Sequence, residues 1–188
     1  MWYLAIYSPI AALRHDYIRQ AVQDATNSIK LTRRLSELLE ICLRNMDSIN
    51  ATCDLLNHEP STARSLVGMR IRSWGPNWEA QIPYALLASK VYEPEVSSRH
   101  EDSQLARYTR FVRFIIKQQG LEHAQSAKPV LDGNEIKSLF GVQKGGKFIK
   151  TAIDDLLIFG FDHQDCGKED AKAWLLARRE SLGVPLTG

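Results

Sequence analysis

The sequence predicts an all-α protein, a helical body followed by a small helical tail, with no sheet. Apolar residues recur at spacings of three and four through most of the 188 residues, which is the period of a helix buried along one face. No run of alternating apolar and polar residues is found, and no Asn-Gly turn joins two apolar runs as in a hairpin. The composition, 44% hydrophobic and 24% charged, is that of a globular chain with a substantial core.

The body is expected over residues 1–95. Its central helix has a continuous apolar stripe from Leu35 to Ile49. Ser61 has the side chain of a helix cap, and Gly75-Pro76 is a helix terminator. The expected helices are, in order, an apolar opening helix that ends near Ser8-Pro9, one around residues 17–22, one from about Leu31 to Leu56, one that begins after Ser61 and one from Trp78 to about Glu93.

A connecting region is expected over residues 96–127. The polar stretch 93–103 is the most linker-like part of the chain, and a helix from about Gln104 to Gln119 follows it. On a helical wheel that helix has two faces. One face is apolar and is expected to pack, with Leu105, Tyr108, Val112 and Ile115. The other is a cationic stripe of Arg107, Arg110, Arg113 and Lys117.

The tail is expected over residues 128–188. Asp132 and Glu135 have the spacing of a capping box at the start of a helix that ends near Phe140. Two more helices are expected, from Lys147 to about Phe161 and from Lys168 to about Leu182.

Charge and cysteine content limit the protein class. A net charge of +2 is too small to indicate nucleic-acid binding by itself, so local clusters must carry such a prediction. Cys42 and Cys53 lie eleven residues apart on one expected helix, roughly 16 Å along its axis and beyond disulfide reach. With Cys166 the count is odd, which favours a reducing, intracellular compartment. The apolar opening is shorter than the roughly 20 residues of a membrane span, so no membrane association is expected.

The candidate binding site is the glycine-rich basic turn between the first two tail helices. Amide groups at a helix N-terminus, together with ammonium groups, bind phosphate without reading base sequence. A solvated turn whose glycines only allow close packing is the alternative interpretation. Lys128 and Arg70 are weaker candidates, and of Arg70 and Arg72 one is expected to anchor the turn at residues 75–78. The turn contributes Lys144, Gly145, Gly146, Lys147 and Lys150.

Two segments resemble a known enzyme family. The segment KPVLDGNEIKSLFGVQKGGKFIKTAIDDLL, followed by KEDAKAWLLAR, resembles the C-terminal tail of the CCA-adding tRNA nucleotidyltransferases, most closely the eukaryotic and fungal type. The segment VGMRIRSWGPNWEAQIPYALLAS resembles the body segment of the same enzymes. Together the two matches cover roughly residues 66 to 178. The tail departs from the family where Gln-Lys-Gly-Gly stands in place of a turn with proline.

The resemblance implies a tRNA-binding role, in which body and tail dock the tRNA elbow, including its T-arm. Catalysis in the family belongs to a head domain that uses CTP, ATP and Mg²⁺. No head motif is found here, so no catalytic or metal-binding residue is expected. The chain is interpreted as a C-terminal fragment that is inactive alone and partners the missing head and neck. Whether the parent enzyme adds CC, A or CCA, and whether it works in nucleus, cytoplasm or mitochondrion, is left open.

A helical protein-interaction module without an RNA role is the alternative function. In that interpretation the apolar opening, residues 1–13, contacts a partner protein. The same opening predicts self-association, because an apolar helix that is not covered by the rest of the chain tends to associate with another copy.

Overall fold

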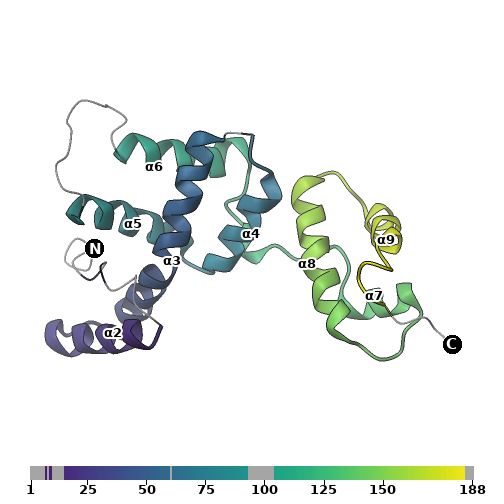
Figure 1. Cartoon of the computed structure of the whole chain (residues 1–188), viewed down its shortest axis with the longest axis horizontal. Helices are drawn as coiled ribbons and strands as arrows, with labels where there is room; N and C mark the ends of the chain where they lie inside the picture. The colour runs from purple at the N-terminus through teal and green to yellow at the C-terminus, as the bar shows by residue number, and fades with distance from the viewer. Residues whose placement is uncertain (1–6, 8, 10–14, 60, 93–103, 185–188) are drawn as a thin grey trace. The chain divides into compact units, whose positions relative to one another are not determined.

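A computed structural model of the chain describes residues 7, 9, 15–59, 61–92 and 104–184. Every regular element in these residues is a helix and none is a strand, so the expected all-α class is confirmed (Figure 1). None of the helices described is long and apolar enough to cross a membrane. Of the apolar opening at residues 1–13, residues 1–6, 8 and 10–13 lie outside the described residues, and so does the linker at 93–103.

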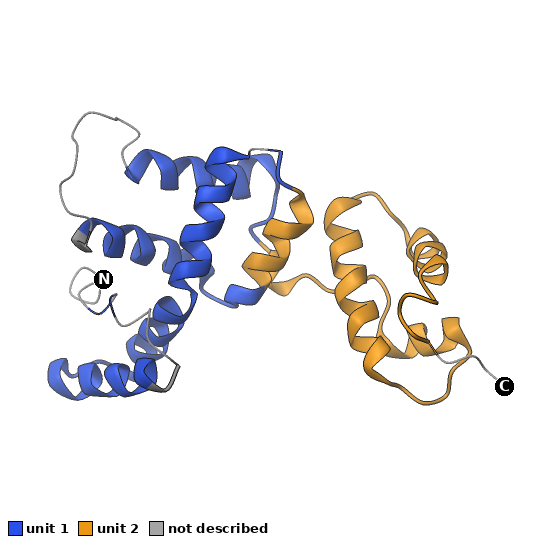
Figure 2. Cartoon of the chain, in the orientation of Figure 1, with its two compact units in different colours: residues 1–62, 73–122 blue, residues 63–72, 123–188 orange. Residues whose placement is uncertain are grey.

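The chain divides into two compact units (Figure 2). Unit 1 comprises residues 1–62 and 73–122, and unit 2 comprises residues 63–72 and 123–188. These boundaries differ from the 1–95, 96–127 and 128–188 expected from the sequence. The basic helix expected as a connector lies within unit 1, and the short segment 63–72 groups with the tail.

Unit 1 is organised around its longest helix, α3. This helix contacts α2, α5 and α6, and α5 also contacts α6. Thr32 caps it by accepting a hydrogen bond from the amide of Leu35 at 3.4 Å. The predicted apolar stripe is buried at its centre, and Leu35 is only half-buried at its edge. The elements of unit 1 are α2 (His15–Ile29), α3 (Arg33–His58), α5 (Trp78–Tyr92), α6 (Gln104–Arg113) and the π-turn η2 (Phe114–Gln118).

Two buried tryptophans fix the start of α5 in the core of unit 1. Trp74 and Trp78 are 2% and 1% exposed and belong to the core. The Trp74 indole donates to the Ser48 hydroxyl at 2.9 Å and packs edge-to-face on Phe111 at 6.3 Å. The buried Gln81 amide donates to the Trp74 carbonyl at 3.0 Å. These bonds satisfy polar groups that burial would otherwise leave without partners.

Unit 2 is a small helical cluster with its own core. Its buried side chains include Ile136, Phe140, Phe148 and Leu156, and α7, α8 and α9 contact one another in pairs. The 3₁₀ turn η3 (Ala124–Ser126) precedes these helices. Their bounds are α7 (Gly133–Phe140), α8 (Lys147–Asp162) and α9 (Lys168–Ala177).

The helix α4 (Arg64–Trp74) begins against the C-terminal end of α8. The Asp162 carboxylate accepts a hydrogen bond from the Ser65 amide at 2.9 Å. Arg64 donates to the Phe161 carbonyl, and its guanidinium lies 5.9 Å from the centre of the Phe161 ring. The prediction that Ser61 caps this helix is therefore wrong, because the helix starts at Arg64 and a carboxylate from α8 supplies the cap oxygen.

Two further elements differ from the sequence prediction. The α-helical part of the sixth helix ends at Arg113 and continues as the π-turn, in which the Gln119 amide donates to the Phe114 carbonyl at 3.0 Å. The last helix ends at Ala177 instead of near Leu182, and turns follow it up to Gly183, which has a φ of 63°. Both differences arise at helix ends, where packing and local hydrogen bonds decide the last turn.

Candidate nucleic-acid interface

The N-terminus of α7 is capped by the carboxylate of its N-cap residue, Asp132. Asp132 accepts hydrogen bonds from the amides of Asn134 at 2.8 Å and Glu135 at 2.9 Å. The Glu135 carboxylate accepts from the Asp132 amide at 2.9 Å, which completes the predicted capping box. An anion is therefore already present where the dipole of α7 attracts one. Gly141, with a φ of 67°, ends the helix.

The N-terminus of α8 has no such closure. Gly146 is its cap residue, has an extended backbone and offers no side-chain oxygen to the first-turn amides. No acidic residue lies in the first turn. The Ile149 amide bonds back to the Gly146 carbonyl at 3.1 Å. The amides that precede Ile149 thus lie at an exposed helix start that favours a bound anion.

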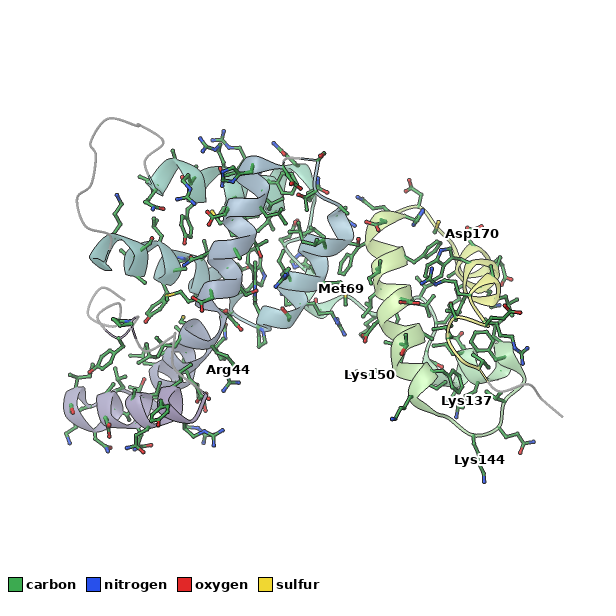
Figure 3. The ribbon with its side chains drawn as sticks, viewed as in Figure 1. Arg44, Met69, Lys137, Lys144, Lys150 and Asp170 are labelled. Carbon is green, nitrogen blue, oxygen red and sulfur yellow. The ribbon has the colours of Figure 1, made fainter. Side chains whose placement is uncertain are left out.

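Basic side chains surround this open helix start. Lys144, Lys147 and Lys150 are exposed, as are Gly145 and Gly146. Figure 3 shows Lys137, Lys144 and Lys150 around the α7–α8 turn, with the Lys144 and Lys150 side chains directed away from the ribbon. The structure therefore gathers the five residues of the predicted turn at one solvent-facing end of unit 2.

A shallow hollow of about 490 Å³ lies between the first turns of α7 and α8. Gly133, Asn134 and Lys137 line it from α7, and Gly145, Gly146 and Ile149 line it from the α8 side. A Cβ on Gly146 would lie 3.2 Å from the Phe148 ring, whereas a Cβ on Gly145 would have an ordinary contact with Ile149 at 3.7 Å. The close packing around Gly146 shows that glycine at this position also serves the core.

The weaker candidates in unit 2 differ in their surroundings. Lys128 and Arg70 are exposed. Arg72 is half-buried and donates to the Ala127 carbonyl. One of the two arginines was expected to anchor the turn at residues 75–78. Arg72 does not do so through this hydrogen bond, because Ala127 belongs to the segment before α7.

The cationic residues on α6 are partly engaged with α3. Arg107 forms an ion pair with Asp54, and the Arg110 Nε donates to the Asn57 amide oxygen at 2.9 Å. Arg113 and Lys117 are exposed. Residues 104–119 contain no acid, but folding brings Asp54 beside Arg107 from 53 residues away.

A second hollow, of about 320 Å³, lies between the end of α3 and the helix formed by α6 and the π-turn. Arg110 and Arg113 line it, and α3 contributes Asn57 to it. Gln118 completes its polar lining. Sequence reasoning missed both amides, since no local signal places Asn57 beside Gln118. Phe114 is 8% exposed and belongs to the core.

The predicted residues are thus divided between the units. Arg107, Arg110, Arg113 and Lys117 belong to unit 1, and the seven others belong to unit 2. Among the described residues, no group of three or more His, Cys, Asp or Glu side chains is placed to hold a metal ion. The Asp155 carboxylate on α8 accepts a hydrogen bond from the Arg178 Nε at 3.2 Å.

Comparison with known proteins gives two related sequences. The chain is similar to the tRNA nucleotidyltransferase cca1 of Schizosaccharomyces pombe, with 23% identity over 159 residues, which are 84% of this chain and 31% of the relative. It is similar to the tRNA nucleotidyltransferase cca2 of the same organism, with 28% identity over 152 residues, which are 80% of this chain and 30% of the relative. The chain spans about a third of the length of these curated relatives. No family model and no solved structure matches the chain. The two similarities confirm the resemblance to tRNA nucleotidyltransferases drawn from the residues.

Proposed function

We propose that this chain is the tRNA-binding part of a tRNA nucleotidyltransferase, and that the open N-terminus of α8 binds phosphates of the tRNA backbone. The observation that carries this proposal is the contrast between the two helix starts. Asp132 closes α7, while α8 begins at Gly146 without a side-chain cap, among exposed lysines. Similarity to two enzymes named for tRNA supports RNA as the source of the phosphate.

Binding at this turn is independent of base sequence. Amide and ammonium donors contact phosphate oxygens, which are the same in every nucleotide. Such a contact suits the docking of a shared feature, the tRNA elbow, where the acceptor stem stacks on the T-arm. The tRNA 3′ end then reaches a catalytic head outside these residues, where Mg²⁺, CTP and ATP are used.

The cationic residues of unit 1 form a second set of proposed phosphate contacts. Arg113 and Lys117 are exposed, so their charges are available to a backbone phosphate without loss of a core contact. Arg107 is bound to Asp54, which lowers its expected share of the binding free energy. The proposal therefore ranks the α7–α8 turn first and Arg113 with Lys117 second.

The test compares two triple variants of the chain that remove the same charge. The first replaces Lys144, Lys147 and Lys150 by Gln, which keeps helix propensity and much of the side-chain length. Its tRNA affinity is expected to fall, and the slope of log affinity against log salt to flatten by up to about one unit per lost contact. The control replaces three exposed cations elsewhere, Arg19, Arg34 and Lys90, by Gln.

Filter binding or fluorescence anisotropy with several different tRNAs measures both variants, and thermal unfolding confirms that each is folded. The control is expected to lose little affinity and to keep the salt slope. Equal loss in the two variants would mean that only net charge matters. Unchanged affinity and slope in the first variant would reject the α7–α8 turn as the RNA contact.

A further inference from the structure

Unit 1 has a groove whose apolar walls the RNA proposal does not use, although Arg113 and Lys117, the second-ranked phosphate contacts, also line it. It is open, has a volume of about 420 Å³, and lies between α5 and the helix formed by α6 and η2. Figure 1 shows α5 and α6 side by side in unit 1. One wall is formed by Ile82, Pro83 and Leu86 of α5, and the other by Leu105, Val112 and Ile116.

Large apolar side chains are exposed in this groove. Leu105 is 61% exposed and Ile116 is 36% exposed. The wheel placed Leu105 and Val112 on the packing face, and for Leu105 that prediction is wrong. The buried side of the helix is formed by Tyr108, Phe111, Phe114 and Ile115, whereas Leu105 lies on the groove side of α6.

Leu105, Val112 and Ile116 line the same side of the groove. Leu105 and Val112 lie seven residues apart on α6, which places them on one face of that helix, and Ile116 of the π-turn continues the lining. Two neighbouring helices with such apolar faces form a trough suited to a third helix, whose apolar residues recur at i, i+3 or i+4, and i+7.

The charges at the groove are all of one sign. Arg113 and Lys117, four residues apart, line it and are exposed. Every other residue lining the groove is uncharged. A ligand that fills the groove therefore gains from carboxylates beside an apolar face.

RNA is anionic like an acidic peptide, but it fits this groove poorly. The walls of the groove are mostly aliphatic, whereas unpaired bases bind by stacking on aromatic rings. The aromatic residue that lines it, Tyr108, is 5% exposed and donates its hydroxyl to Asn50. The ring thus has little free face for a base.

From these observations we infer that the groove binds an amphipathic helix of a partner protein, with its apolar residues between α5 and α6 and its acidic residues beside Arg113 and Lys117. This interaction surface is independent of the proposed tRNA contact in unit 2. It gives the chain a protein partner of defined chemistry, a helix with an apolar stripe and an acidic flank.

The probe for this inference is a set of synthetic helical peptides. The first has leucines at i, i+3, i+4 and i+7 and glutamates along one flank. The second has lysines in place of the glutamates, and the third has the composition of the first in scrambled order. Fluorescence anisotropy with the full 188-residue chain is expected to show one-to-one binding of the acidic peptide, about tenfold weaker binding of the lysine peptide and no binding of the scrambled one.

Matched variants locate the binding site. Leu105→Glu places a charge in the groove and is expected to weaken binding of the acidic peptide at least about tenfold. Leu176→Glu is the control, since Leu176 is also a largely exposed leucine, at 44%, but lies on α9 in unit 2. The double change Arg113→Glu and Lys117→Glu is expected to reverse the preference, so that the lysine peptide binds more tightly than the acidic one.

Several outcomes would overturn the inference. Equal binding of acidic, lysine and scrambled peptides would show non-specific apolar adhesion. Equal loss in Leu105→Glu and Leu176→Glu would place the site elsewhere. If sedimentation shows that the chain alone forms a dimer that Leu105→Glu converts to a monomer, the occupant is a second copy. If the double variant weakens tRNA binding and leaves peptide preference unchanged, the two cations belong to the RNA surface. In all of these experiments circular dichroism must show that each variant is folded.

Discussion

A Cβ atom added to Gly68 would lie 2.9 Å from three atoms of the Phe161 ring. The absence of a side chain on α4 therefore creates the space for a ring from α8, 93 residues later in the chain. The C-terminal end of α8 also supplies the Phe161 carbonyl that accepts a hydrogen bond from Arg64 and the Asp162 carboxylate that caps α4. Glycine is required at this position by packing, since its backbone is ordinary helix.

Replacing Gly68 by Ala is expected to destabilise the chain by about 1–3 kcal/mol, because the Phe161 ring must move out of a packed position. Gly160→Ala is the matched control. Gly160 lies inside α8 with nothing within 4 Å of an added Cβ, so alanine there is expected to stabilise by up to about 1 kcal/mol. Urea unfolding measures both, and opposite signs are the expected result. A neutral or stabilising Gly68→Ala would contradict the packing argument.

Removal of the cap that α8 provides to α4 is expected to cost about 1 kcal/mol. Asp162→Ala leaves the Ser65 amide without its acceptor at a helix start. Asp165→Ala, an exposed aspartate in the turn after α8, serves as the control and is expected to change stability by less than about 0.5 kcal/mol. Chemical unfolding distinguishes the two, and indistinguishable stabilities would mean that the carboxylate contributes nothing to α4.

Stability is expected to fall in acid because of the capping box on α7. Hydrogen bonds from the Glu135 and Asn134 amides lower the pKa of Asp132 below its ordinary 3.8. The hydrogen bond from Lys168 lowers the pKa of Glu135 below its ordinary 4.5. Since both folded-state pKa values are depressed, their stabilising contribution is complete above the ordinary values and is lost as the pH falls through the folded ones.

The unfolding temperature measured from about pH 6 to about pH 3 tests this linkage. Asp132→Asn keeps a good helix cap but has no charge to titrate, so its stability at neutral pH should be similar and its acid slope shallower. Parallel pH curves for the two proteins would exclude Asp132 as a source of the acid sensitivity.

The three described cysteines are expected to differ in reactivity. Burial raises the pKa of the Cys42 thiol to about 12 and also raises that of Cys53, so both are thiols near neutral pH and are shielded from reagents. Cys166 is partly exposed. Mass spectrometry after brief iodoacetamide treatment should find label on Cys166 alone, and label on all three in urea. Rapid labelling of Cys42 in the folded protein would show that α3 is not packed as described.

Local signals predicted the parts of the fold whose causes are local. Asp132 and Gly75 lie next to the helix ends that they determine, so the start of α7 and the end of α4 were placed from adjacent residues. The start of α4 was missed because Asp162, its cap, is 97 residues from Ser65. Short-range pattern reading has no access to such a partner.

In the candidate site, too, the features with local causes were predicted and those that depend on distant residues were not. The basic turn could be found because its residues are nearly contiguous, from Lys144 to Lys150. The engagement of Arg107 by Asp54, and the amide of Asn57 beside Arg110, could not be found, because those residues come from a different helix. The groove was missed for a different reason. The wheel assigned Leu105 to the packing face from its position alone, and only the placement of α5 beside α6 shows that Leu105 lines an open groove.

The π-turn also sets how many residues this stretch of helix holds. A turn closed by bonds between residues five apart, as from the Gln119 amide to the Phe114 carbonyl, holds one residue more than the α-turn it replaces. Removing one residue within 114–118 is therefore expected to let the same stretch close as an ordinary α-turn. Because Ile116 belongs to this turn and lines the groove, the one-residue surplus is part of the surface that the groove offers to a partner.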